Sequence, residues 1–165
     1  MMRISCKGFS YVELMFSIAI LAMLAAAATP YLEKTIQRNK ESQLREHLRD
    51  IRQAIDTYKI ASDAGKIQKS VGDSGYPKSL DELVIGVPDQ TDPQKKRLRF
   101  LRNLPADPMY AADARTAPAE INPQNTWGKR SYDSDADNPH AGADVFDVYS
   151  YNAQKGLNGI AYQQW

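Results

Sequence analysis

Gly8-Phe9-Ser10-Tyr11-Val12-Glu13-Leu14 begins an apolar run that continues to Leu32. As a helix with a rise of about 1.5 Å per residue, residues 9–32 would be about 36 Å long. That length exceeds the hydrocarbon core of a bilayer, about 30 Å, so the run predicts a transmembrane helix. Two basic residues, Arg3 and Lys7, precede it. Basic flanks tend to stay in the cytoplasm, which predicts a single span with the larger part of the chain on the other side.

Glu13 is the only charged residue between Phe9 and Leu32. A carboxylate inside a membrane helix costs about 2.5–3.5 kcal/mol on insertion scales, so it marks a functional site whose partner has to be identified. The alternative is structural: Glu13 lies one turn inside the interface and extends its carboxylate to water.

Pro30 interrupts the same run. It has no N–H to donate to the carbonyl of Ala26, so a kink or a loosened turn is expected there. The apolar pattern resumes afterwards, and the helix is therefore predicted to continue past Pro30.

The order of residues around Gly8 resembles the processing site of type IV pilins and of type II secretion pseudopilins. A basic leader is followed by Gly8, Phe9, an acid four residues after Phe9, and an apolar run. In that family a prepilin peptidase cuts after the glycine and methylates the new N-terminus. The resemblance implies that residues 1–8 are a cleaved leader and that Phe9 becomes the N-methylated first residue.

The resemblance also implies a partner for Glu13, namely the N-terminal amine of a neighbouring subunit. An α-amine has a pKa of about 8 and is cationic at neutral pH. Each charge is costly alone in a low-dielectric setting, so such a pair fixes how two subunits are staggered. In this family the turn next to a proline at the depth of Pro30 can loosen on assembly. The implied partners are a homo-oligomeric filament, other pseudopilins, the prepilin peptidase and an inner-membrane assembly platform.

A secretory signal peptide is an alternative for the N-terminus. A basic start, the apolar stretch Leu14–Leu24 and the four alanines at 25–28 fit one, with release of a soluble binding domain near Thr29. Glu13 near the start of the apolar stretch, and the amphipathic pattern after Pro30, argue against it.

Beyond the apolar run, Tyr31 to about Ser62 is predicted to be the amphipathic half of the helix. Its apolar residues recur at mostly three- and four-residue spacing: Ile36, Leu44, Leu48, Ile51, Ile55 and Tyr58. The other faces are charged, with pairs such as Glu41–Arg45 and Glu46–Arg49 that would contribute a few tenths of a kcal/mol each. Gly65 is predicted to end the helix.

Short strands are predicted for Thr126–Tyr132 and Val145–Tyr151. A third, weaker strand is placed in Ala111–Ile121 or near Ile160–Trp165. The fold class is therefore α+β, with a small antiparallel sheet packed on the second half of a long helix, as in pilins. Residues 33–165 are predicted to form this pilin-like domain in the periplasm.

The middle of the chain adds two weaker resemblances to the major pseudopilins. Tyr76-Pro77 precedes a predicted short helix, in which Ser79 and Glu82 would form a capping box. The segment Leu101-Arg102-Asn103-Leu104-Pro105-Ala106-Asp107-Pro108-Met109 resembles a segment of that family with the pattern apolar-basic-x-apolar-Pro-x-Asp-Pro. The structural alternative is a helical turn or strand end capped by a Pro-rich turn. Val87–Lys96 between them is predicted to be a loop.

Calcium is the one candidate cofactor. Asp133, Asp135, Asp137 and Asp144 match positions 1, 3, 5 and 12 of a calcium loop, but Asn138 replaces its glycine. A solvated acidic loop is the alternative. The major pseudopilins bind calcium through aspartates in their C-terminal loop, whereas this chain has no acid after Asp147. Amide and backbone oxygens are therefore expected to hold the C-terminal loop without metal.

Composition argues against other classes. The chain has 21 basic and 20 acidic residues, a balance that gives no electrostatic footprint for nucleic acid. Its single cysteine, Cys6, lies in the leader, so no disulfide scaffold or cysteine metal site is expected. The sequence contains neither a phosphate-binding glycine loop nor a nucleophile–base pattern, so no motif indicates an enzyme.

The expected function is mechanical. The chain is predicted to be a single-pass inner-membrane subunit of a type II secretion pseudopilus, assembled through its apolar helix to drive protein export. A minor type IV pilin is the alternative within the same class, and a secreted soluble binding domain is the alternative from another class.

Overall fold

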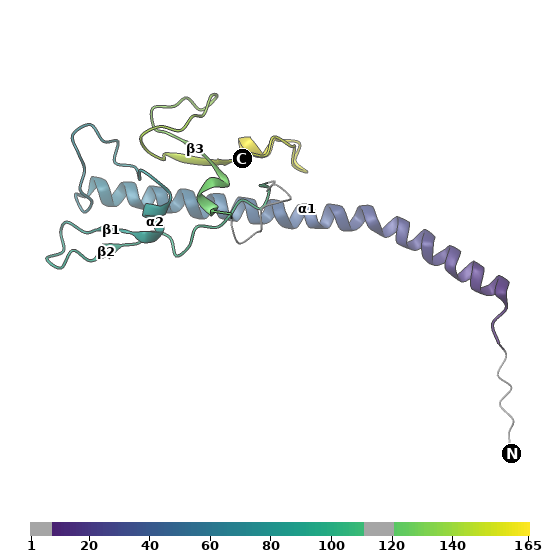
Figure 1. Cartoon of the computed structure of the whole chain (residues 1–165). Helices are drawn as coiled ribbons and strands as arrows, with labels where there is room; N and C mark the ends of the chain where they lie inside the picture. The colour runs from purple at the N-terminus through teal and green to yellow at the C-terminus, as the bar shows by residue number, and fades with distance from the viewer. Residues whose placement is uncertain (1–7, 111–120) are drawn as a thin grey trace, which may run out of the picture. The chain divides into compact units, whose positions relative to one another are not determined.

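The computed structural model describes residues 8–110 and 121–165. The chain divides into two compact units, Met1–Asn39 and Lys40–Trp165, each considered by itself below. Figure 1 shows the order of the helices and strands along the chain.

Helix α1 spans Tyr11–Asp63, and its first half contains the predicted membrane span, 9–32, except for Phe9 and Ser10, which precede the helix. The helix continues through Pro30 without ending, as predicted. Every residue from Gly8 to Ile36 is exposed. Ile36 was predicted to join the buried stripe, and that prediction is wrong: 56% of its surface is exposed, because the stripe begins only at Glu41.

The second half of α1 buries the predicted apolar stripe, Leu44, Leu48, Ile51, Ile55 and Tyr58. Gly65 terminates the helix, as predicted, with a φ of 73°. The Lys66 amide donates to the Ala61 carbonyl and the Gly65 amide to that of Ser62, both at 3.0 Å. This pair of bonds is a Schellman motif, which uses the left-handed conformation that glycine adopts without strain.

Helix α2 (Asp81–Ile85) confirms the predicted short helix but not its cap. Ser79 does not cap it through its side chain, and the N-cap position is Leu80. The Glu82 carboxylate instead accepts hydrogen bonds from the Lys78 amide and the Tyr58 hydroxyl, both at 3.1 Å. Glu82 therefore makes the side-chain-to-backbone bond of a capping box, but with the amide of Lys78 instead of Ser79. The same carboxylate also bonds to Tyr58 of α1.

Strands β1 (Val87–Pro88) and β2 (Arg97–Leu98) pair antiparallel. They replace part of the predicted loop at 87–96 with a short hairpin. Gly86 shows why the chain turns here: its φ is 81°, and a Cβ on it would lie 2.5 Å from the Leu98 carbonyl oxygen. Only a residue without a side chain permits that approach.

Strands β3 (Trp127–Arg130) and β4 (Asp147–Ser150) confirm both predicted strands. They pair antiparallel, with Trp127 opposite Ser150 and Arg130 opposite Asp147. Short 3₁₀ helices, η2 (Pro123–Asn125) and η3 (Tyr162–Gln164), lie before β3 and at the C-terminus. The third strand is not formed at 160–165, where one bridge joins Lys155 to Ala161. Its other predicted position, 111–121, lies almost wholly outside the described residues.

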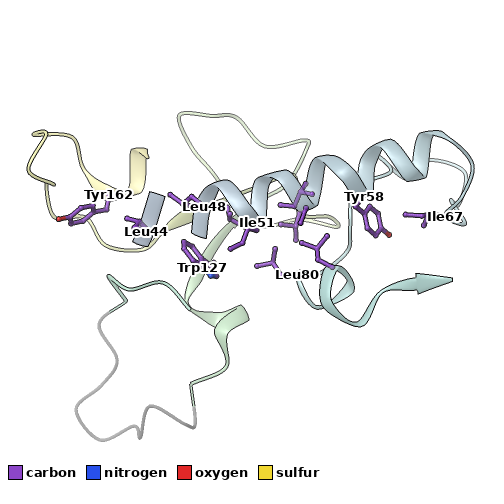
Figure 2. Packing of buried hydrophobic residues seen from close by; sticks show 13 residues of the cluster. Leu44, Leu48, Ile51, Tyr58, Ile67, Leu80, Trp127 and Tyr162 are labelled. Atoms are coloured by element: carbon purple, nitrogen blue, oxygen red, sulfur yellow. The ribbon is translucent and has the colours of Figure 1, made fainter. Parts of the chain in front are cut away.

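One hydrophobic core joins the sheet to the helix. Trp127 and Val148 from the sheet, and Leu80 from the segment before α2, are fully buried with the α1 stripe. Figure 2 shows Trp127 and Leu80 beside the face of α1 that carries Leu48, Ile51 and Tyr58. The α+β prediction with a small antiparallel sheet is thus confirmed in its coarse form.

Candidate functional site

The predicted processing site lies immediately before α1. Gly8 and Phe9 are exposed, and 80% of the Phe9 surface is accessible. A Cβ built on Gly8 would meet no atom within 4 Å. The peptide bond between these residues is therefore open to an enzyme, and a larger side chain at Gly8 would not disturb the fold.

Glu13 lies in the first turn of α1, and its side chain is exposed. No described residue donates a hydrogen bond to its carboxylate, although the Glu13 carbonyl accepts one from the Ser17 hydroxyl at 2.8 Å. A carboxylate in the first turn is favoured by the helix dipole, by about 0.3–1 kcal/mol. The position thus tolerates a negative charge locally and leaves the carboxylate available to a group outside the chain.

The surface around Glu13 is apolar over several turns. An 18-residue window of α1 has a mean hydropathy of 2.1, with none of it buried inside the structure. Within residues 8–110 and 121–165, one helix, near the N-terminus, is long and apolar enough to cross a membrane. By length and composition, a signal sequence would satisfy the same criterion.

The calcium candidates are not brought together. Asp133, Asp135 and Asp137 are exposed, and among the described residues no three acidic, histidine or cysteine side chains could hold a metal ion. Buried Ser134 organises the loop instead, because its hydroxyl accepts from the His140 amide at 3.0 Å. The loop is closed by hydrogen bonds within the protein, and the structure gives the calcium prediction no support.

Asp144, which is partly buried, is held by hydrogen bonds that the other three acids do not share. Its carboxylate accepts hydrogen bonds from the hydroxyls of Ser74 and Ser131 and, at 2.9 Å, from the Tyr132 amide. Burial raises the pKa of Asp144, but these hydrogen bonds outweigh burial and leave the pKa below its usual value. Asp144 therefore joins the loop after α1 to the segment that follows β3.

Replacing Asp144 with Asn tests this structural role through pH. A carboxylate whose pKa is depressed by folding stabilises the protein above the unfolded-state pKa, about 3.9, and loses that contribution as the pH falls through the folded-state value. We expect Asp144→Asn to cost about 1–2 kcal/mol at pH 7 and progressively less below pH 4. Urea unfolding of the full chain in detergent, followed by tryptophan fluorescence, measures the difference. A cost that stays constant down to pH 2.5 would contradict the role.

Asp107 is the buried acid whose structural role the sequence did not reveal. It is 4% exposed and accepts hydrogen bonds from the Ser150 hydroxyl at 2.6 Å and the Met109 amide at 2.7 Å. Burial raises the pKa of Asp107, and these bonds, with the nearby His47, offset only part of that effect. The Asp-Pro pair in this segment was the available signal, since such a pair favours a turn, but it did not indicate burial.

Glu41 is a second buried acid, predicted on the sequence to pair with Arg45 on the helix surface. It is 4% exposed, and its Oε1 accepts hydrogen bonds from the Leu157 amide at 2.8 Å and the Tyr162 hydroxyl at 2.9 Å. Further along the helix, Arg52 donates to the Trp165 carbonyl at 2.8 Å and pairs with Asp147 at 2.7 Å. Side chains of α1 thus hold the C-terminal segment through hydrogen bonds to its backbone and to the Tyr162 hydroxyl.

Comparison with known proteins found no similar protein. No family model matches this chain, and neither the curated proteins nor the solved structures contain a match. The described part of the chain is therefore α+β, with a helix whose first half is exposed, apolar and long enough to cross a membrane.

Proposed function

We propose that this chain is a structural subunit of a type II secretion pseudopilus. It is processed between Gly8 and Phe9 and assembles with further copies and other pseudopilins through the first half of α1. The observation that supports the proposal most is the exposed apolar surface of that half, with one uncompensated acid, Glu13. Such a surface has to be covered by lipid or by other apolar helices.

The proposal accounts for both environments of the helix. Before assembly, lipid covers the apolar surface, and the subunit is a single-pass protein of the inner membrane with its folded unit in the periplasm. During assembly, neighbouring helices replace the lipid, and the N-terminal amine of one subunit meets Glu13 of another. Since a charge pair is far less costly in an apolar setting than two separate charges, the pair selects one stagger between subunits.

The lack of an acid after Asp147 weakens assignment to the major pseudopilins, so a minor type IV pilin remains the second candidate within the same class. In this chain Glu41 and Arg52 hold the C-terminal segment through hydrogen bonds, at the place where major pseudopilins use calcium. Deletion of the gene distinguishes the two candidates: loss of protein export supports the pseudopilus, and loss of surface pili supports the pilin.

Intact mass and N-terminal sequence, measured on protein taken from its own cell membranes, test the proposal. We expect a chain that starts at Phe9 and carries one added methyl group. A start near Thr29 would overturn the proposal in favour of a soluble exported domain, and a start at Met1 would overturn processing.

A matched pair of variants sharpens this measurement. Gly8→Val should leave the leader attached, whereas Ser10→Ala should be cut normally. Neither change affects the folded unit, because Gly8 and Ser10 are exposed and precede α1. Equal cutting of both variants would argue against a peptidase that reads Gly8.

A further inference from the structure

The unit Lys40–Trp165 carries a groove beside the second half of α1. It has a volume of about 600 Å³ and lies between the helix and the C-terminal segment. Three arginines at helical spacing, Arg45, Arg49 and Arg52, line one side, and Ile160 and Trp165 line the other. The groove therefore combines positive charge with an apolar wall.

Two of these arginines are available to a partner. Arg52 is already committed to Asp147 and the Trp165 carbonyl. Arg45 stacks on the Trp165 ring at 4.4 Å, which occupies the face of its guanidinium but leaves its N–H edges. Arg49 is exposed and forms no salt bridge within the described residues, and the predicted pair with Glu46 is not formed there. One acid, Asp56, also lines the groove.

The acidic loop, Asp133–Asn138, has the complementary properties. Its three aspartates are exposed, and none forms a salt bridge with a described residue. The loop is nevertheless held in one form: the Ser131 amide donates to the His140 carbonyl at 3.0 Å and the His140 amide to Ser134 Oγ at 3.0 Å. An ordered loop loses less conformational entropy on binding than a flexible one.

Within one chain the acidic loop lies away from the groove. Tyr132, next to the loop, stacks on Tyr76 with ring centroids 5.7 Å apart, and Lys59 lies over Tyr76 at 5.4 Å. Lys59 follows Arg49 by about ten residues, which corresponds to roughly 15 Å along α1. Arg45 and Arg49 therefore lie at a different position along α1 from the acidic loop, although the lining of the groove continues toward Lys59 as far as Asp56.

We propose that the arginine groove binds the acidic loop of a second copy of this chain, with Arg45 and Arg49 facing Asp133, Asp135 and Asp137. The contact joins two different patches, so it is head-to-tail, and contacts of that kind extend into open assemblies unless a rotation closes them. The inference concerns how neighbouring copies meet in the proposed filament, and it rests on that proposed function.

A second set of exposed acids on the same unit is the alternative partner for the arginines. Glu46 and Asp50 lie on another side of α1, with Phe100 and Arg102, but they line a hollow of their own. Two hollows facing each other leave a gap, whereas a protruding loop fills a groove, and Arg102 already offsets part of that charge. Shape and charge thus favour the acidic loop.

Cysteine cross-linking of the full chain in its own membranes tests the contact. The background is Cys6→Ser, so that no native thiol interferes whether or not the leader is removed. Copies carrying Arg49→Cys are expressed together with copies carrying Asp135→Cys, and a mild oxidant is added. We expect a disulfide-linked dimer, and a ladder of larger species when one chain carries both substitutions.

The matched controls replace Asp135→Cys by Gln94→Cys, an exposed residue of the β1–β2 turn, or by Asp50→Cys. Dimer yield with Asp135→Cys should exceed both several-fold. A yield equal to that of Gln94→Cys overturns the contact, and a higher yield with Asp50→Cys reassigns the groove to the second acidic face.

Charge reversal gives an independent measurement. Arg49→Glu should lower self-association in detergent about two- to fivefold, the range for one exposed ion pair, and adding Asp135→Arg should restore it. Salt at about 1 M should weaken the wild-type association, because it screens exposed charges beyond about 3 Å. A double variant that associates no better than Arg49→Glu overturns the pairing.

Failure of this inference is distinguishable from failure of the proposed function. If the chain starts at Phe9 but the Arg49–Asp135 pair does not cross-link, the subunit assembles through other contacts. If the chain starts elsewhere, the filament proposal itself is overturned.

Discussion

Replacing Glu13 with Leu is expected to abolish assembly while leaving the subunit folded and in the membrane. The carboxylate is exposed in the first turn of α1, so its removal breaks no internal contact of the described chain. In the proposed filament its loss leaves the N-terminal amine of a neighbour unpaired in an apolar setting. Removing one partner of a buried charge pair costs about 3–5 kcal/mol, roughly a hundredfold or more in the association constant.

The same substitution has an opposite effect on insertion. An acid within a membrane helix opposes insertion by about 2.5–3.5 kcal/mol, so Glu13→Leu should enter the bilayer at least as well as wild type. Fractionation of cells into membranes and sheared filaments measures both effects at once. We expect an unchanged membrane fraction and no subunit in the filament fraction.

Glu33→Leu is the matched control, because it makes the same chemical change on the same helix just beyond the apolar run. It should assemble like wild type. If Glu13→Leu also assembled normally, Glu13 would be an interfacial residue without a partner, and the proposed pairing would be wrong.

Trp127→Ala is expected to have the largest effect on the folded unit. Trp127 is fully buried, and its indole N–H donates to the Pro105 carbonyl at 2.8 Å. Truncation of a buried tryptophan costs about 3–5 kcal/mol, a large part of the 5–15 kcal/mol that is typical of a domain. The melting temperature, followed by circular dichroism on the full chain in detergent, should fall by roughly 10–20 °C.

Trp165→Ala provides the comparison. Trp165 is partly exposed, packs on Tyr162 with ring centroids 5.1 Å apart and supports Arg45. A cation–π contact at an exposed site contributes about 0.5–1 kcal/mol, so this variant should lose about 1–2 kcal/mol. Equal losses in both variants would show that β3 is not anchored through Trp127.

The sequence by itself determined the elements whose signals are local. Apolar spacing along the chain predicted α1 and its buried stripe from Leu44 to Tyr58, and Gly65 predicted where the helix ends. Alternation and turn residues predicted β3 and β4. A periodic pattern reports which side of an element is apolar because each side chain's direction follows from the backbone geometry alone.

Only the tertiary structure decided which polar groups are buried and what satisfies them. Glu41 reads as one more charge on a helix surface, yet it bonds to Tyr162, 121 residues away. Asp107 bonds to Ser150 across 43 residues, and Asp144 accepts hydrogen bonds from Ser74 and Ser131 rather than joining a metal site with the acids with which the sequence grouped it. A buried acid is stable only where donors from distant segments converge on it, and that convergence depends on how the sheet and the C-terminal segment pack on α1.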